Sequence, residues 1–569
     1  MWLALALVII SPTLAHAGEF ASSYDWKLFQ TWLEAGRRSV LWYHQFPLWN
    51  PWTCGGQVYL ANPQSLVATP TFALVLAFGT ALGAKLTLLV YFFCAFDGQY
   101  RLARSYELSV PASMLAAILF GAGGWLALHF SEGHCTFFGA ALFPYAMYFY
   151  RRARDEFEYC IPLAFIAAWI VGDGGTSTPP MCVVILATLA ITDAIKRRSA
   201  RPFVPLLAAG GLALAVGALR VFPAVQFVFD HPRHLFETDA NSPWAMIRNA
   251  YWWKGIEPVA GKRYYFHEYG WRLPYLTIPL WLWSIRVRAA RQIWAFVGVG
   301  AAIVAGSFWP YGPWWLLHHL PIFRDLRVPS RYQIMFAIGV PLLCAMAFDD
   351  LRAQKFWRKG FTVAVLVLCA VDGLAFGVVR FMHGLGDIPV FSLKWDLAQE
   401  GTPFYQVVGT WREMMSNVFE NRGAIGCDEE APLQRALKLD EGPGPQARLE
   451  EPAKGTIIAT RWSPNRVEVD LELRAPTVVS VNENWNEHWR LELIGDSRTA
   501  ENGELIRVGP KLERDKDGGR LGARVPRGHY TVAFVYRPRS FVLGAITSAL
   551  AIPLSIFAWL AWRRRRRTR

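Results

Sequence analysis

Long apolar stretches recur along most of the chain and define its architecture. The hydrocarbon core of a bilayer is crossed by about 20 apolar residues in a helix, so the pattern predicts an α-helical polytopic membrane protein with about 11 to 12 transmembrane helices. Two stretches are short for a full crossing. The stretches fall near residues 1–17, 84–100, 111–129, 136–150, 159–172, 181–195, 202–225, 272–285, 292–307, 331–348, 361–380 and 541–562.

The basic residues give these helices an orientation. They gather in short connections at 101–104, 151–154, 196–201, 286–291 and 352–359 and in the run 563–567. Each group lies two crossings from the next if the apolar segment 66–82 does not span. The positive-inside rule then places all of them in the cytoplasm, and 66–82 is predicted to be re-entrant or interfacial.

Composition excludes several other classes of protein. The chain is 53% hydrophobic and 18% charged, with 26 Trp and 37 Phe, which excludes a disordered chain. The net charge of +14 is explained by the cytoplasmic connections, so no nucleic-acid partner is predicted. Membrane lipids are the expected surroundings.

The orientation divides the chain into six parts. Residues 1–17 resemble either a retained anchor helix or a cleaved signal peptide; we favour the anchor, and in both cases residue 18 lies outside. The parts are a transmembrane or signal-anchor helix (1–17), a first outer loop (18–83), a multi-helix transmembrane domain (84–380), an outer domain (381–540), a last transmembrane helix (541–562) and a basic cytoplasmic tail (563–569).

The outer domain is predicted to be β-rich from about residue 455. Residues 466–473 (RVEVDLEL) and 530–536 (YTVAFVY) alternate with a period of two, which is typical of strands in a small β-sandwich. A helix is expected near 404–419. Of the eight cysteines, only Cys54 and Cys427 fall clearly in outer segments, and a bridge between them is left open.

The first outer loop holds the residues best suited to chemistry. Asp25 follows the first apolar stretch, and the segments PLWNP (47–51), GGQ (55–57) and ANPQS (61–65) come after it. Aromatic faces and side-chain amides suit sugar rings, which offer apolar faces and hydroxyl edges. An interfacial aromatic belt with a capping Asp would give the same composition, so both readings stay open.

These segments resemble the first loop of YfhO-like bacterial membrane proteins, relatives of the GT-C glycosyltransferases that use polyprenyl-phosphate-linked sugars. Further matches lie at 267–269 (HEY), 320–332 (LPIFRDLRVPSRY), 525–530 (VPRGHY) and 536–538 (YRP). The resemblance covers nearly the whole chain. The N-terminal segment is shorter than expected, and the loop 172–180 lacks an expected His.

The resemblance implies a GT-C-like enzyme of the bacterial inner membrane. It would transfer a sugar from undecaprenyl phosphate to an envelope glycan, lipid or polymer acceptor on the outer face. A lipid-phosphate sugar carries its own leaving group, which agrees with the lack of a Gly-rich nucleotide loop. Asp25 is predicted to be the single base, and displacement by one base inverts the anomeric carbon.

The remaining site predictions follow from residue type and position. Arginine binds phosphate bidentately, although near a membrane surface it also extends towards lipid headgroups. The residues predicted to bind the donor phosphate are Arg324, Arg327, Arg331 and Arg220. Those predicted to bind the acceptor or the sugar are Trp49, Asn50, Gln57, Asn62, Gln64, His267 and Glu268.

No metal ligand is assigned, because the weak His129–His134 spacing and the adjacent pair His318–His319 are the only ones that come near a metal-binding pattern. A divalent ion near Asp25 is left open, as is the oligomeric state. Two other functions also stay open: a transporter or flippase for lipid-linked sugars, and a non-catalytic envelope assembly or anchoring protein.

Overall fold

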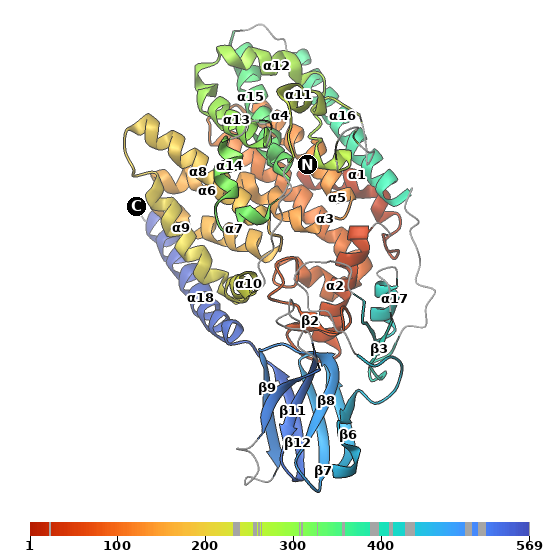
Figure 1. Cartoon of the computed structure of the whole chain (residues 1–569). Coiled ribbons are helices and arrows are strands. Elements are labelled where there is room, and N and C mark those ends of the chain that lie inside the picture. The colour runs from red at the N-terminus through yellow and green to blue at the C-terminus, as the bar shows by residue number, and fades with distance from the viewer. Residues whose placement is uncertain are drawn as a thin grey trace.

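The computed structural model joins a large helical body to one β-sandwich (Figure 1). It describes residues 1–21, 24–230, 239–253, 259, 262, 264–306, 308, 311–326, 328–354, 359–386, 398–408, 413–426, 439–495, 503–509 and 519–567. The last helix, α18, leaves the sandwich and runs along the helical body beside α9 and α10 to the C-terminus.

The helical body has the composition of a multi-pass membrane domain, as the apolar pattern predicts. Among the described residues, six helices are long and apolar enough to cross a bilayer, or up to eight if each of two bent pairs is one span. The helices are α1 (Trp2–Leu14), α2 (Tyr24–Leu41), α3 (Phe72–Arg104), α4 (Val110–Gly121), α5 (Gly124–Ser131), α6 (Phe143–Asp155), α7 (Cys160–Gly172), α8 (Thr178–Arg197), α9 (Phe203–Val216), α10 (Ala218–Asp230), α11 (Pro243–Asn249), α12 (Thr277–Trp283), α13 (Arg291–Val304), α14 (Pro313–His318), α15 (Ile334–Ala353), α16 (Lys359–Gly386), α17 (Met414–Phe419) and α18 (Arg539–Arg567).

Several apolar stretches are bent, and the apolar helices Trp2–Leu14 and Phe157–Gly172 are short, so among the described residues fewer helices qualify than the predicted 11 to 12. The stretch 202–225 bends by 90° between α9 and α10, and the pair Thr277–Arg286 and Arg288–Val304 bends by 97°. The stretch 136–150 begins as a 3₁₀ helix, Cys135–Leu142, before α6. Apolarity alone does not report these bends.

The segment 66–82 contributes the start of α3. Gly79 takes a φ of 78°, which divides the helix into a short first part and a long second part. A Cβ on Gly83 would lie 2.5 Å from the Val75 Cα. The first part therefore packs closely against the second instead of continuing it in a straight line.

The outer domain contains two antiparallel sheets of four strands. One has the order β10-β11-β8-β5 and the other β6-β7-β12-β9. The strands are β5 (Ala447–Leu449), β6 (Gly455–Ser463), β7 (Arg466–Leu473), β8 (Thr477–Asn484), β9 (Trp489–Gly495), β10 (Glu504–Val508), β11 (Arg520–Val525) and β12 (Gly528–Tyr536). The predicted alternation is confirmed in β7, where Val467, Val469 and Leu471 are buried between half-buried polar residues.

The helix expected near 404–419 is correct only at its end. Tyr405–Val407 is a strand, β3, which pairs in parallel with β4 (Arg422–Ala424). Within the described residues of this range, 404–408 and 413–419, the helix is α17, Met414–Phe419. The side chain of Gln406 is buried inside this small pairing, a tertiary contact that local propensity does not predict.

Candidate active site

Asp25 lies in the first turn of α2 and pairs with a histidine from a distant turn. Its Oδ2 is 3.1 Å from Nε2 of His134, and its side chain is 31% exposed. A carboxylate in a first helical turn is favoured by the helix dipole. Gly133 (φ 85°) lets the turn approach, because a Cβ there would lie 2.5 Å from the backbone nitrogen of Trp26. One edge of the carboxylate is thus held, while the side chain remains accessible.

Two more histidines surround His134. Its Nδ1 is 2.9 Å from Nδ1 of His129, so one of these nitrogens donates to the other. The ring of His267 lies 4.8 Å from that of His134, measured between centroids. The indole of Trp26 donates to the Ser131 carbonyl at 3.0 Å. These contacts fix the turn that carries His134 against the start of α2.

Glu268 and Arg331 form a two-point ion pair beside the histidines. The Arg331 Nε donates to Glu268 Oε2 at 2.9 Å, and its Nη2 donates to the other carboxylate oxygen. Glu268 is buried in a 3₁₀ turn, Phe266–Glu268, and Arg331 lies in another, Pro329–Gln333. The guanidinium also lies 4.9 Å above the Phe137 ring. The pair therefore has a fixed orientation.

Burial and neighbouring charged groups both shift the pKa values of the side chains in this cluster, for some of them in opposite directions. Burial lowers the pKa of His267 to about 4, which leaves it neutral. Burial also disfavours protonation of His134, but its hydrogen bond to Asp25 outweighs this and raises its pKa. Burial raises the pKa of Glu132 to about 7. For Glu268, the effect of burial is outweighed by the Arg331 charge, which lowers its pKa well below the ordinary value.

The same cluster offers a donor set for a metal ion. His134, His267 and Glu268 each provide one ligand atom, and these atoms lie within 4.8 Å of one another. Two imidazoles and a carboxylate are a common zinc set. His267 Nδ1 is buried and has no hydrogen-bond partner among the described residues. Binding there would compete with the Asp25 bond of His134 and with the Arg331 bond of Glu268.

Other predicted sugar-binding residues lie in contacts of the first loop. Trp49 is fully buried in the short hairpin formed by β1 (Trp49–Asn50) and β2 (Gln57–Val58). Its indole donates to Glu483 of β8 at 3.2 Å. Asn50 and Gln57 are also buried, and both donate to the Thr53 hydroxyl. To bind a sugar, these side chains would first have to leave these contacts.

The ANPQS segment (61–65) is held by hydrogen bonds from Arg220. The Asn62 side-chain oxygen accepts from the Gln64 backbone N–H at 3.0 Å, which makes a local turn. Arg220 Nη2 donates to the carbonyls of Asn62 and Ser65 at 2.7 and 2.9 Å. Arg220 is thus an anchor of the first loop.

The arginines of the segment 320–332 do not share one environment. Arg324 is exposed in a 3₁₀ turn, Phe323–Asp325, and Arg327 lies outside the described residues. Arg331 contacts the cluster through its ion pair with Glu268. The structure therefore brings together Asp25, His267, Glu268 and Arg331 of the predicted set, and adds His134.

The Asp25–His134 pair is the main feature that the sequence does not reveal. The two residues are far apart along the chain, and no motif spacing links them. The only signal was the weak His129–His134 spacing, which the structure turns into a direct hydrogen bond. Cys54 is disulfide-bonded, whereas Cys427 lies outside the described residues.

Comparisons with known proteins give structural likenesses only. No family model matches the sequence, and no curated protein matches it. The chain is similar to arabinofuranosyltransferase AftD from Mycobacteria, with a TM-score of 0.48 and 13% identity over 76% of this chain and 32% of AftD. It is also similar to ArnT from Cupriavidus metallidurans, solved with bound undecaprenyl phosphate, with a TM-score of 0.43 and 12% identity over 74% of this chain and 84% of ArnT. The chain spans about a third of the length of AftD. The YfhO-like resemblance stays a prediction.

Proposed function

We propose that this chain is a membrane glycosyltransferase that moves a sugar from a polyprenyl phosphate, of the undecaprenyl class, to an envelope glycan, lipid or polymer acceptor. One observation carries the proposal: an accessible carboxylate, Asp25, is held 3.1 Å from His134 beside a cluster of buried polar groups. A general base needs this combination of a fixed orientation and an open edge.

The position of Asp25 relative to the basic residues supports transfer on the outer face. α2 packs on the first half of α3, where Thr80 donates to Glu34 at 2.7 Å. Arg101 and Arg104 lie at the other end of α3. The positive-inside rule assigns those arginines to the cytoplasm, and on that orientation we place Asp25 on the outer face.

In the proposed reaction, the acceptor hydroxyl gives its proton to Asp25. The acceptor oxygen forms a bond to the anomeric carbon while the bond from that carbon to the phosphate oxygen breaks. The lipid phosphate leaves with the electron pair of the broken bond. His134 is a positioning residue that orients the carboxylate, and a single displacement inverts the anomeric carbon.

The leaving phosphate needs a cation or a fixed dipole. We assign this role to Arg331, whose Nε and Nη2 are held by Glu268; its Nη1 would contact the phosphate. A divalent ion held by His134, His267 and Glu268 would supply positive charge to the same group. Among the predicted acceptor residues, His267 and Glu268 lie closest to this chemistry.

The test is sugar turnover by the purified full chain in liposomes. A panel of undecaprenyl-phosphate sugars is supplied as donors with envelope extract as acceptor. Asp25→Asn should lower turnover by about 10²- to 10⁴-fold, the usual contribution of a general base. The matched control is Glu451→Gln, at a carboxylate of the β-domain whose side chain is 56% exposed, and it should keep wild-type turnover.

Three other results would contradict the proposal in different ways. Turnover that survives Asp25→Asn would exclude this carboxylate as the base. Movement of intact donor across the liposome membrane, without sugar transfer, would favour the flippase. Binding of envelope glycan without transfer or transport would favour the anchoring protein. Circular dichroism and melting temperature verify that each variant is folded.

A further inference from the structure

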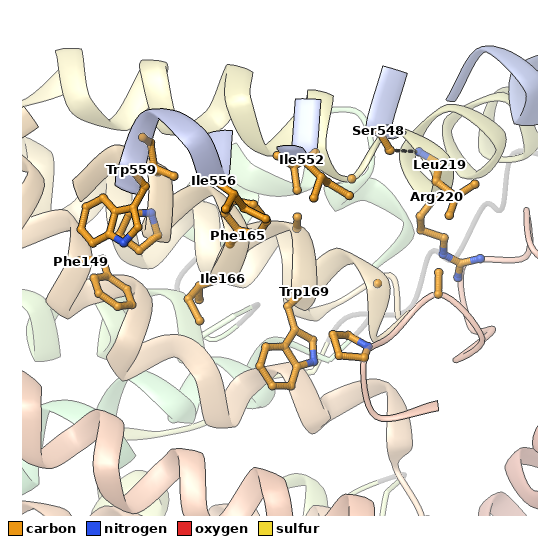
Figure 2. Close-up of a pocket in the computed structure, with 18 residues that line it drawn as sticks. Phe149, Phe165, Ile166, Trp169, Leu219, Arg220, Ser548, Ile552, Ile556 and Trp559 are labelled. Carbon is orange, nitrogen blue, oxygen red and sulfur yellow. Dashed lines mark hydrogen bonds between the residues drawn. The ribbon is translucent and has the colours of Figure 1, made fainter. Parts of the chain in front are cut away.

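A cavity of about 670 Å³ lies between α7, α10 and α18 (Figure 2). Its size is that of a typical ligand pocket. Apolar side chains dominate its walls, among them Phe165, Ile166 and Trp169 of α7 and Ile552 and Ile556 of α18. None of the residues that form the Asp25 cluster lines it.

The cavity is elongated along one face of α18. Ser548, Ile552, Ile556 and Trp559 line it at spacings of four, four and three residues, which places them on one side of a helix. Trp559 lies 11 positions after Ser548, which spans about 16 Å at 1.5 Å per residue, about half of the 30 Å hydrocarbon core. In Figure 2, Arg220 lies at the Ser548 end, and Phe149 lies beside Trp559 at the other.

Arg220 gives this apolar cavity one charged end. It is 3% exposed, and its Nη2 makes both bonds to the first loop. Its Nη1 is buried and has no hydrogen-bond partner within the described part of the chain. No carboxylate among the described residues forms an ion pair with it. A buried cationic donor without a partner is costly, so an anionic group at this end would stabilise it.

The depth of Arg220 identifies the leaflet. α9 begins directly after Arg201, and its 14 residues rise about 21 Å, so Arg220 lies far from that basic end. Trp559, at the other end of the cavity, comes just before the basic run 563–567. On the topology predicted from charge, the Arg220 end therefore faces the outer leaflet.

We propose that this cavity binds one acyl chain of an anionic phospholipid from the outer leaflet, with its phosphate at the Arg220 end of the cavity. A chain of one leaflet matches the length of the cavity, whereas a polyprenyl chain is much longer. The bound lipid would hold α18 against α7 and support the Arg220 contacts to Asn62 and Ser65. This inference does not depend on the proposed transferase activity.

Native mass spectrometry of the delipidated full chain with phosphatidylglycerol tests the proposal. Arg220→Gln should weaken binding about tenfold, the effect of losing one charge-assisted hydrogen bond. Ile556→Trp should weaken it as well, because the indole would fill the cavity while Arg220 stays in place. Leu554→Trp is the matched control: Leu554 lies on α18 and is 67% exposed but does not line the cavity.

Four results would overturn the inference. The first is equal phosphatidylglycerol binding by all variants, and the second is equal binding of phosphatidylcholine and phosphatidylglycerol by the wild type. The third is a loss of binding in Ile556→Trp but not in Arg220→Gln. The fourth is that the protein retains undecaprenyl phosphate in place of phosphatidylglycerol. The last would assign the cavity to the donor lipid. Because the Ile556→Trp variant keeps the Arg220 contacts, it separates lipid binding from unfolding of the first loop.

Discussion

Glu483 is a buried carboxyl group at the contact between the β-sandwich and the first outer loop. It is 2% exposed, and its two oxygens accept hydrogen bonds from the indoles of Trp49 at 3.2 Å and Trp462 at 3.3 Å. Burial raises its pKa from an ordinary 4.5 to about 8. At neutral pH the folded protein therefore keeps this group protonated, whereas the unfolded chain ionises it.

The sign and size of the effect follow from linkage. A folded pKa above the unfolded one gives stability that is fully present below pH 4.5 and is lost as the pH rises through about 8. Each pKa unit is worth about 1.4 kcal/mol. Relative to acid conditions, the free energy of unfolding should be lower by about 3 kcal/mol at pH 7 and about 5 kcal/mol above pH 8.

Glu483→Gln should remove this pH dependence. The glutamine side chain never ionises. Its one oxygen accepts from one of the two indole N–H groups, whereas its NH₂ group takes the place of the other acceptor and faces the second indole N–H, at a cost of about 1–3 kcal/mol. We expect the variant to be less stable than wild type at pH 4.5 and more stable at pH 8.5. The two stability curves should cross between these values.

Thermal unfolding of the full chain in detergent, followed by near-UV circular dichroism from pH 4.5 to 8.5, measures this crossing. Glu451→Gln serves as the control because its carboxylate is exposed, and its curve should follow wild type. A Glu483→Gln melting temperature that stays parallel to wild type over the whole range would refute the reasoning. It would mean that the carboxyl is ionised and stabilised in the folded protein.

Two further substitutions test contacts that hold the fold. Gly56→Ala should lower the free energy of unfolding by about 1–3 kcal/mol. Gly56 has a φ of +98°, and a Cβ there would overlap Glu483 and approach the Trp49 indole to 2.8 Å. The melting temperature of the full chain measures the change. Asp372→Ala should lower the free energy of unfolding by about 3 kcal/mol, since Arg272 is 1% exposed and donates to Asp372 at 2.7 and 2.8 Å. Monodispersity and the melting temperature in detergent measure this loss. Adding Arg272→Met should restore much of the stability, and no recovery would contradict the ion-pair explanation.

The class of fold could be predicted from the sequence because its signals are local. Apolar length identifies the membrane helices, and the period of two identifies β7 and β12 with no knowledge of their partners. The bends at Gly217 and near Val287 were not predictable in this way, because an apolar stretch reads alike whether straight or bent by 90°. The strand Tyr405–Val407 depends on its partner Arg422–Ala424, which no local pattern reveals.

The candidate site was predicted as separate residues but not as an arrangement. Asp25, Glu268 and Arg331 were each identified by residue type and by the family resemblance. Their joint position depends on His134, which pairs with Asp25 only because the turn at Gly133 packs on α2. Trp49 is a predicted sugar-binding residue that the structure places elsewhere. A tryptophan in this loop suits a sugar ring, but its indole N–H also suits a buried carboxyl partner. In the structure this indole donates to Glu483.

The contact between the sandwich and the first loop explains how Asp25 keeps its position at the start of a helix. α2 has 18 residues, about 27 Å in length, and is fixed at both ends. At its start, the Trp26 indole donates to Ser131, and near its end Arg38 donates to the Phe419 carbonyl at 2.9 Å. The loop beyond α2 is in turn held by Asn484, which donates to the carbonyls of Cys54 and Gly56 at 2.6 and 2.9 Å. The outer domain thus fixes the far end of the helix that carries the proposed base, so a mutation that loosens the sandwich should also disturb Asp25.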